Sequence, residues 1–360
     1  MITSGATGQA VPSLPVPSQP VPSSGPLRFR LTDQEADQAR AAVAALAEAA
    51  PPKAADEPTE LLRAVPAAVR LLPERLLRFL DEFRREEPAG GFVVSGWNVD
   101  DVALGPTPVH WRTTAGVEHT TLAHELYLMV IASGLGEVFS WSTVQDGKLV
   151  QDLCPVRGEE KEKNAGSSDS VLDLHTEDAF SPLRCDYLGL LCLRNDDRVP
   201  TEYASVDQLA LTPAQRRVLA QPRYMLTPDE EHLRRAAERG EQPPAPLHTG
   251  VLFGSSSAPY LAFDEYFLGT DPDDQEAQAA LQALTDELRR CSSVVALAPG
   301  ELLIVDNYRA VHGRRPFLAR YDGRDRWLKR IAVTRDLRRS RAARASVGSP
   351  VVNTGAAPMG

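Results

Sequence analysis

The segment Leu174–Asp178, LHTED, places two potential metal ligands two positions apart, the imidazole of His175 and the carboxylate of Glu177. In an extended chain, residues i and i+2 point to the same side, so these two groups can approach one point. A second histidine from elsewhere in the chain would complete a face of two histidines and one carboxylate. That face suits non-haem iron(II) oxygenases because it leaves coordination positions open. The triplet alone is weak evidence, since such short patterns occur by chance.

Seven histidines are present, and the third ligand has to come from among them. His124 precedes a glutamate, but position 128 is not a histidine, so the zincin helix motif is absent and a core position is the better interpretation. His312 follows the strand-like run Leu302–Asp306 and precedes Gly313 and several arginines, so we expect it to be the third ligand. The others lack a distinguishing pattern of charged neighbours: His110, His119, His232 and His248.

Two arginines beyond His312 fit the co-substrate that this chemistry uses. 2-Oxoglutarate chelates iron through its keto acid end, and its far carboxylate then needs a cation. The planar fork of arginine can hold a carboxylate through two hydrogen bonds and keeps its charge. Arg326 follows His312 by 14 residues, which leaves room for a turn and a return on a neighbouring strand. Arg330, four residues further, points to the same face of a strand and can meet a second carboxylate.

The elements that must position these residues are helices near the N-terminus and strands afterwards. Thr32 and Glu35 form a capping-box signature, which predicts a helix that continues to Ala50. Apolar periodicity predicts further helices over about residues 60–87, 120–133 and 274–290. Strand-like runs lie at Gly91–Val99, Val138–Thr143, Tyr187–Arg194, Gly250–Phe253, Leu302–Asp306 and Trp327–Thr334. This order predicts a mainly β fold with supporting helices, a sandwich or jelly roll.

Composition limits the other classes. The chain has 360 residues, 42% of them apolar, and a formal net charge of −10, which argues against a nucleic-acid-binding surface. Its apolar runs are shorter than the roughly 18 residues of a membrane span and no signal-peptide layout is seen, so we expect a cytoplasmic protein with no membrane partner. Four cysteines without Cys-x-x-Cys spacing indicate reduced thiols. We expect a disordered Pro-rich tail over residues 1–27, a single domain over residues 28–344 and a flexible tail over residues 345–360.

Four longer stretches resemble one known family. They are residues 107–113 (TPVHWRT), 175–182 (HTEDAFSP), 186–195 (DYLGLLCLRN) and 306–330 (DNYRAVHGRRPFLARYDGRDRWLKR). Together they are similar to the clavaminate synthase-like iron(II)- and 2-oxoglutarate-dependent oxygenases, and within these to the arginine 3-hydroxylases of viomycin, capreomycin and streptothricin biosynthesis. The likeness extends over roughly residues 28–344.

The resemblance implies a distorted double-stranded β-helix, the jelly-roll core of this family. It implies that His175, Glu177 and His312 hold iron(II), and that 2-oxoglutarate and O2 are the co-substrates. It further implies that Arg326 binds the far carboxylate of 2-oxoglutarate, with the hydroxyl of Thr201 as its partner.

For the amino-acid substrate, the resemblance implies that Arg330 binds the α-carboxylate, while Glu177, Ser168 and nearby polar groups receive the α-amine. One departure concerns this end of the substrate. The arginine hydroxylases carry two consecutive glutamines in the segment before the metal-binding triplet, and here Val144 replaces the first while Gln145 matches the second.

A second departure concerns the substrate side chain. The family's two aspartates around the guanidinium correspond to positions 264 and 266, where this chain has Asp264 and Tyr266. A ring can stack on a guanidinium, but the loss of one carboxylate removes a charge-assisted contact of about 1.5–3 kcal/mol. We therefore expect the pocket to suit a modified arginine, a cyclic guanidine amino acid or a less basic side chain.

The expected reaction is hydroxylation of an unactivated C–H, at Cβ or Cγ, of a free arginine-like amino acid in peptide natural-product biosynthesis, with 2-oxoglutarate converted to succinate. Two alternatives remain: an amino acid tethered to a carrier protein, and a catalytically silent protein that binds 2-oxoglutarate or an amino acid. The segment of about residues 157–170, charged and rich in Gly and Ser, is either a lid over the site or a plain surface insertion.

Overall fold

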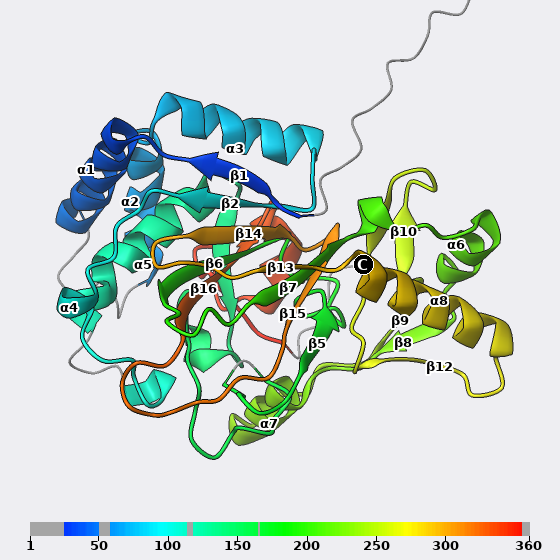
Figure 1. The fold of residues 1–360 in the computed structure, drawn as a ribbon. Helices are drawn as coiled ribbons and strands as arrows, with labels where there is room; N and C mark the ends of the chain where they lie inside the picture. Colours follow the sequence, from blue (N-terminus) through cyan, green and yellow to red (C-terminus); the bar gives the residue numbers. More distant parts are fainter. Residues whose placement is uncertain (1–24, 50–57, 114–117, 165, 355–360) are drawn as a thin grey trace, which may run out of the picture.

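The computed structural model describes residues 25–49, 58–113, 118–164 and 166–354. The expected N-terminal tail falls outside these residues up to position 24. Residue 27 does not belong to a tail, because it begins the first strand. Two sheets lie face to face at the centre of the described structure, and helices cover their outer faces (Figure 1).

The larger sheet of the described residues has eight strands in the order β1-β2-β14-β6-β16-β3-β17, with β4 also paired to β16. Antiparallel pairing dominates, and β1–β2 and β17–β3 are parallel. The strands are β1 (Leu27–Arg30), β2 (Gly91–Ser95), β3 (Glu137–Trp141), β4 (Val150–Leu153), β6 (Tyr187–Arg194), β14 (Leu302–Asp306), β16 (Trp327–Thr334) and β17 (Val351–Val352). Because one sheet uses strands from Leu27 to Val352, we infer a single domain that extends beyond the expected bounds of residues 28–344 at both ends.

The smaller central sheet has the order β13-β7-β15-β5, with all neighbours antiparallel. Its strands are β5 (Leu172–His175), β7 (Thr201–Ser205), β13 (Ser293–Val295) and β15 (Ala310–Arg314). Two satellite sheets, β12-β8-β9 and β10-β11, are formed by β8 (Tyr224–Leu226), β9 (Leu247–Thr249), β10 (Leu252–Gly254), β11 (Pro259–Leu261) and β12 (Leu268–Thr270).

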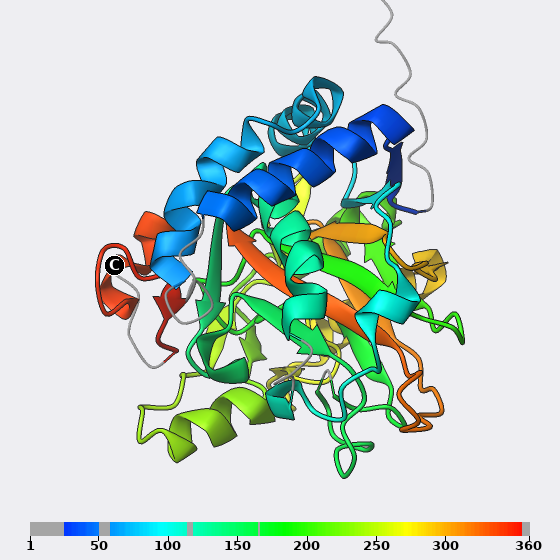
Figure 2. The same cartoon turned by 90° about the vertical axis from the view of Figure 1, so that its left-hand side faces the viewer.

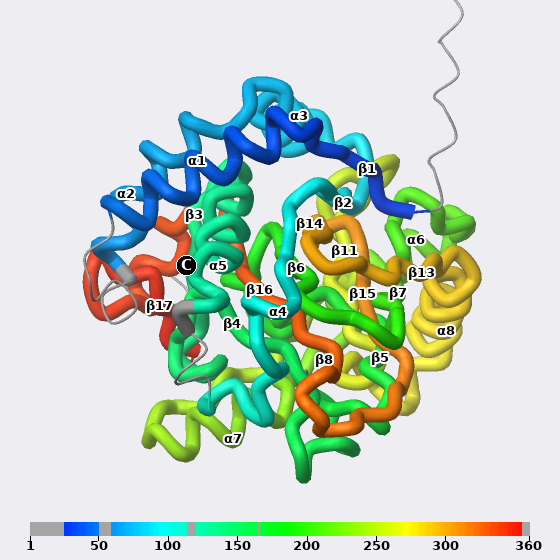
Figure 3. The backbone as a smooth tube through the Cα atoms, turned by 60° about the vertical axis from the view of Figure 1, so that its left-hand side comes forward, coloured from blue at the N-terminus to red at the C-terminus, as the bar shows by residue number. Residues whose placement is uncertain are grey.

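Helices pack on both outer faces. The outer face of the large sheet is covered by α1 (Asp33–Ala49), α2 (Pro58–Val69), α3 (Glu74–Glu86) and α5 (Glu118–Ser133). In Figure 2, α1 in dark blue and α5 in teal lie in front of the strands. The small sheet is covered by α6 (Pro213–Leu219) and α8 (Gln275–Cys291), on the opposite side in Figure 3. The short helix α4 (Asp101–Leu104) and the helix α7 (Glu230–Glu238) lie at the edges, with 3-10 turns at Trp111–Thr113, Gln145–Gly147, Val206–Gln208 and Leu337–Ala343.

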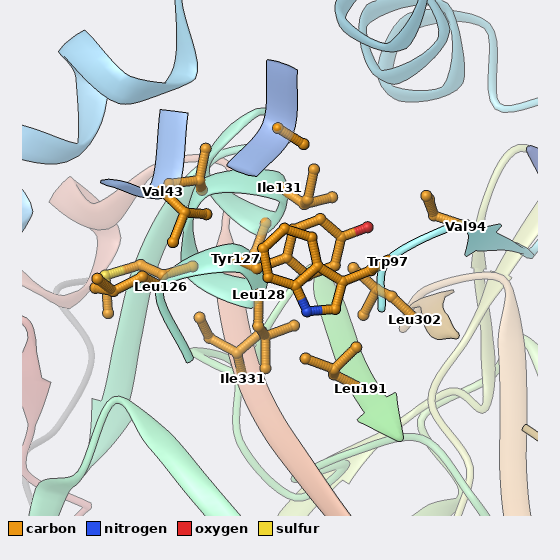
Figure 4. Packing of buried hydrophobic residues seen from close by; sticks show 14 of the residues in the cluster. Val43, Val94, Trp97, Leu126, Tyr127, Leu128, Ile131, Leu191, Leu302 and Ile331 are labelled. Carbon is orange, nitrogen blue, oxygen red and sulfur yellow. The ribbon is translucent and has the colours of Figure 1, made fainter. Parts of the chain in front are cut away.

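Strand alternation divides the large sheet into an outer and an inner face. On β6, Leu191 and Leu193 join the core under the helices, whereas Leu188 and Leu190 join the core between the two sheets. Successive side chains of a strand point to opposite faces, which explains this division. Figure 4 shows the outer core, where Trp97 stacks on Tyr127 with ring centroids 4.1 Å apart. The expected jelly-roll core of a mainly β fold is thus confirmed.

Several predicted elements are confirmed, and others need correction. Strands β6, β14 and β16 have the predicted bounds, and the capping box at the start of α1 is present, with the Thr32 backbone N–H donating to Glu35 Oε2 over 2.8 Å. The helical region over residues 60–87 is wrong as one helix, because it breaks before Pro73, where a residue preceding proline disfavours helical geometry. The C-terminal tail is wrong over residues 351–352, where β17 pairs with β3.

The described part of the chain has no helix that combines the length and apolar character needed to cross a membrane.

Candidate active site

The inner space of the sandwich receives side chains from both sheets. On β16, Trp327 and Ile331 pack under the helices and Leu328 packs between the sheets, so Arg330 shares the inner face with Leu328. On the small sheet, Ala310 of β15 belongs to the core between the sheets and Val311 to the core under α8. Side chains two and four residues from Ala310 therefore face inward, which directs His312 and Arg314 into the sandwich.

Strand pairing brings the three predicted metal ligands together. His312 of β15 lies directly opposite His175 of β5, and their ring centroids are 4.3 Å apart. Glu177 follows β5 by two residues, and its Oε2 lies 3.9 Å from His175 Nε2 and 3.5 Å from His312 Nε2. The donor atoms of all three residues fall within 4.8 Å of one another. This separation allows one metal ion to contact all three.

The protonation of these groups suits metal binding. His175 Nδ1 is 2.8 Å from the carbonyl oxygen of Asp173, which fixes the proton on Nδ1 and leaves the Nε2 lone pair facing Glu177. Burial, and then the neighbouring His175, lower the pKa of His312 to about 4, so this imidazole is neutral at pH 7. Burial opposes ionisation of Glu177, but the charge of Arg330 and the hydrogen bond from His312 outweigh it and hold its pKa well below the usual range.

Asn307 holds the Glu177 backbone, a role that sequence reasoning did not identify. Its Oδ1 accepts the Glu177 N–H over 2.6 Å, and its Nδ2 donates to the carbonyl oxygens of Glu177 and Cys185 over 2.9 and 3.0 Å. Asn307 is fully buried in the turn after β14. The only sequence signal for this role was the position of Asn307 in a turn between a buried strand and His312. That signal was weak, because asparagine is common in turns for local reasons.

Arg326 and Thr201 also converge, as predicted from the resemblance. Arg326 lies just before β16, and its Nη2 is 3.4 Å from the Thr201 hydroxyl on β7. Its Nε atom is enclosed without a hydrogen-bond partner, and no carboxylate pairs with it in the part of the chain described. Burial lowers the pKa of Arg326 to about 10. A guanidinium enclosed in this way requires an anion to offset the loss of hydration.

Arg330 contacts the metal-ligand cluster directly. Its Nη1 donates to Glu177 Oε1 over 2.5 Å, and its Nε donates to Gln151 Oε1 on β4 over 2.6 Å. Nη2 is left free of protein partners among the described residues. Arg330 can therefore keep Glu177 ionised and still offer one edge of its fork to a carboxylate next to the metal position.

A cavity opens beside the cluster and continues away from Arg330. Eight of its lining residues are acidic: Asp152, Glu159, Asp173, Glu177, Asp178, Asp229, Glu231 and Asp264. Three are cationic, namely Lys163, Arg330 and His232, whose pKa is raised to about 9. The excess of carboxylates favours a ligand with positive charge.

Asp264 lines the cavity next to the metal ligand His175. It forms an isolated antiparallel bridge with His175, and its Oδ1 accepts the backbone N–H groups of Tyr266 and Phe267 over 2.9 and 2.8 Å. Its Oδ2 has no hydrogen-bond partner in the described residues. Burial raises the pKa of Asp264 despite the opposing charge of His175, so the carboxylate lacks full compensation. The neighbouring Glu265 turns away and pairs with Arg289 of α8.

Tyr266 also lines the cavity but is exposed over 54% of its surface. The ammonium of Lys163 lies 4.9 Å from the Tyr266 ring centroid and 2.8 Å from Asp173 Oδ2. The ring thus already accepts a cation on its face. Lys163 belongs to the segment of residues 157–170. Because Glu159, Lys163, Asn164 and Gly166 of this segment line the cavity, its described residues favour a cover over the pocket rather than a plain surface insertion.

Val144, Gln145 and Ser168, which the resemblance places near the substrate amine, do not all line the cavity. Val144 and Gln145 line the cavity, but the Gln145 amide is occupied by the backbone of Asp152, with Nε2 donating to its carbonyl over 2.7 Å and Oε1 accepting its N–H over 2.9 Å. Ser168 does not reach this cavity. It is buried beside Phe317 and Tyr321, where it lines a separate hollow, because its loop turns outward before β5.

A second group of potential donors, Asp178, Asp229 and His232, was not anticipated. His232 Nε2 lies 2.9 Å from Asp178 Oδ1, and its Nδ1 lies 2.6 Å from the Thr143 hydroxyl, so both ring nitrogens are occupied. Burial lowers the pKa of His232, but the charges of Asp229 and Asp178 outweigh it and raise the pKa to about 9. This group ties α7 to the residue after Glu177 by hydrogen bonds rather than through a metal.

Comparison with known proteins places this geometry in context. Residues 218–332 match the family model described as taurine catabolism dioxygenase TauD, TfdA family. The chain is 38% identical over 315 residues to the L-ornithine/L-arginine 3-hydroxylase of Catenulispora acidiphila, covering 82% of this chain and 92% of that protein. It is 40% identical over 299 residues to the enduracididine beta-hydroxylase of Streptomyces hygroscopicus, covering 78% and 87%. The non-heme iron oxygenase OrfP in complex with Fe and alpha-ketoglutaric acid superposes with a TM-score of 0.82 and 41% identity over 90% of this chain and 99% of that one.

Proposed function

Because this chain belongs to the TauD/TfdA family of iron(II)- and 2-oxoglutarate-dependent oxygenases, and within it to the clavaminate synthase-like amino-acid hydroxylases, we propose that it hydroxylates Cβ or Cγ of a free, positively charged arginine-like amino acid. A place in the biosynthesis of a peptide natural product is part of this proposal. The observation that carries it is the position of an acid-lined cavity directly beside a cluster of two histidines and one carboxylate.

The donor atoms fit iron(II). Two imidazoles and one carboxylate, His175, His312 and Glu177, form the donor set that non-haem iron(II) oxygenases use. His175 and His312 come from adjacent strands of one sheet, and Glu177 follows β5 by two residues. In this proposal the remaining coordination positions are open for 2-oxoglutarate and O2.

The polar groups around the cluster fit 2-oxoglutarate and an amino acid. Arg326 and Thr201 would hold the far carboxylate of 2-oxoglutarate, because no carboxylate among the described residues pairs with the enclosed guanidinium. Arg330 would hold the α-carboxylate of the substrate through its free Nη2, and Glu177 would receive the α-amine. In this division the two carboxylate-binding arginines lie four residues apart, Arg326 just before β16 and Arg330 within it.

When bound, iron(II) and 2-oxoglutarate supply the oxidising chemistry. The chain supplies geometry. Arg330 anchors one end of the substrate and Asp264 the other, which presents the carbons between them to the metal position. Residues on both sides of the cavity would shield the reacting carbons, since Glu159, Lys163, Asn164 and Gly166 line it together with Glu231 and His232 of α7.

The negative charge of the pocket supports a substrate with a cationic side chain. Asp264 offers a free Oδ2, and the Tyr266 ring already lies under the ammonium of Lys163. The named substrates of the two relatives, ornithine, arginine and enduracididine, all carry basic side chains. Because Tyr266 replaces a second carboxylate, the pocket favours a substrate whose planar cation can stack on the tyrosine ring, such as a linear or cyclic guanidine.

The test is a panel of free amino acids incubated with iron(II), ascorbate and 2-oxoglutarate, with mass spectrometry of the products. The panel contains L-arginine, L-enduracididine, L-ornithine and the uncharged arginine isostere L-citrulline. We expect a gain of one oxygen on a guanidine-bearing member, with one succinate formed for each product. His312→Ala is the matched control and should form neither.

The alternatives give different results. Succinate formation without any oxygenated free amino acid, followed by oxygenation of an aminoacyl thioester, would assign the carrier-bound reaction. Binding of 2-oxoglutarate with no succinate from any substrate would assign a silent binding protein. Either result would overturn the proposal.

A further inference from the structure

Arg314 is a buried cation that the proposed reaction has not yet used. It is only 4% exposed and lies at the end of β15, two residues after His312 on the inner face of the small sheet. Its guanidinium lies 4.8 Å above the Phe317 ring, and its Nη2 donates to the Ser167 hydroxyl over 2.8 Å. Its Nη1 is buried without a hydrogen-bond partner, and no described carboxylate pairs with it.

Arg314 lies beside Thr201 and Arg326. In the register of β15 with β7, Arg314 is directly opposite Thr201, whose hydroxyl is 3.4 Å from Arg326 Nη2. Thr201 thus lies between the two arginines, since it is the cross-strand neighbour of Arg314 and its hydroxyl contacts the guanidinium of Arg326. Each arginine has an enclosed nitrogen with no partner, Nη1 of Arg314 and Nε of Arg326. Like charges that share an enclosed space destabilise each other, and a carboxylate between them would relieve both costs.

We propose that Arg314 is a second guanidinium for the far carboxylate of 2-oxoglutarate, opposite Arg326 across the sandwich and next to Thr201. The proposal rests on the proposed function, since it concerns the same co-substrate. It makes Arg314 a binding residue for the co-substrate, in addition to Arg326 and Thr201.

A purely structural role explains less of the geometry. Stacking on Phe317 and one hydrogen bond to Ser167 would both be satisfied by a neutral side chain, at no cost for enclosing a charge. The neighbour Arg315 shows the contrast, because it is 66% exposed along its side chain and pairs with Glu202 over 2.8 Å. The two consecutive arginines therefore differ in partner, one having a protein carboxylate and the other none.

The experiment measures 2-oxoglutarate binding to the iron(II)-loaded protein under anaerobic conditions by calorimetry. The variants are Arg314→Met and Arg314→Lys, with Arg315→Met as the matched control. Each protein is also titrated with 2-oxopentanoate, which has the same keto acid end and chain length but no far carboxylate. The pair of ligands separates loss of the carboxylate contact from general damage to the site.

We expect Arg314→Met to weaken 2-oxoglutarate binding about 10- to 100-fold, the size of one charge-assisted contact, and to change 2-oxopentanoate binding less than about twofold. Arg314→Lys should fall between wild type and Arg314→Met, and Arg315→Met should match wild type. The melting temperature of the free Arg314→Met protein should not fall, because an enclosed charge has been removed.

Equal weakening of both keto acids, or unchanged 2-oxoglutarate binding, would overturn the assignment of Arg314. A wild-type protein that binds neither keto acid would instead overturn the proposed function, so the two failures can be told apart.

Discussion

Replacing Asp264 with asparagine would remove one charge from the substrate pocket and leave the local backbone intact. The side-chain Oδ1 already accepts the N–H groups of Tyr266 and Phe267, and an amide oxygen can accept the same two bonds. Asp264→Ala would break this turn as well as the charge. Asp264→Asn therefore isolates the free Oδ2, which faces the cavity without a protein partner.

The expected magnitude follows from the state of this carboxylate. Burial raises the pKa of Asp264, so its charge is poorly compensated until a cation binds. A hydrogen bond to a charged group contributes about 1.5–3 kcal/mol. At about 1.4 kcal/mol for each factor of ten, kcat/KM for a guanidine substrate should fall about 10- to 150-fold. An uncharged substrate loses no ion pair and should be affected by less than about threefold.

The assay compares L-arginine with L-citrulline, which has the same shape and a neutral urea group. Rates of succinate formation coupled to oxygenated product are measured at saturating 2-oxoglutarate for wild type, Asp264→Asn and Glu265→Gln. Glu265→Gln is the matched control, because it makes the same chemical change one residue further on, where the carboxylate pairs with Arg289 outside the cavity. We expect the preference for arginine over citrulline to disappear only in Asp264→Asn.

The reasoning would be refuted if Asp264→Asn lowered both substrates by the same factor, or if it left the preference for arginine unchanged. In the second case another carboxylate of the cavity must recognise the cation. Asp229 would be the next candidate, since its Oδ2 is 3.9 Å from His232 Nε2 and makes no closer contact in the described residues.

Three further predictions concern the metal, the two carboxylate sites and a buried histidine. His312→Ala should abolish succinate formation and weaken iron(II) binding, because one of three protein ligands is lost; full activity would exclude it as a ligand. Arg326→Lys should raise the KM for 2-oxoglutarate more than that for the amino acid, since a point charge replaces a fork, and Arg330→Ala should do the reverse; a rise for the same ligand in both variants would contradict this division. The pKa of His232 is raised from 6.5 to about 9, so its stabilising contribution is complete below pH 6.5 and is lost as the pH rises to 9, a loss of at most about 3 kcal/mol. Denaturant unfolding at pH 6 and pH 9.5 should show this loss in wild type and not in His232→Gln, and equal pH dependence of the two proteins would count against it.

Local periodicity is what the sequence by itself determined about this protein. The two-residue spacing of His175 and Glu177 follows strand alternation, and the structure brings their donor atoms together with that of His312. Strands β6, β14 and β16 are long apolar runs, so their bounds could also be predicted. The split between α2 and α3 was missed because a long apolar periodicity outweighed the local effect of proline.

Tertiary structure decided which of these faces meet. Two cross-strand pairs depend on the register of strands that are more than a hundred residues apart in the sequence. They are His312 with His175, and Arg314 with Thr201. A shift of one residue would turn every side chain of β15 to the other face, and only packing across the whole sandwich excludes that shift.

The same reason explains the residues whose positions could not be predicted. Asp264 faces the cavity and Glu265 faces α8, although they are consecutive acidic residues in one motif. Ser168 turns into a separate hollow, and His232 reaches Asp178 from a helix 54 residues further along the chain. Residue types and spacing define what chemistry a chain can carry out, but non-local contacts set the direction of each side chain, and these contacts form only when the two sheets pack together.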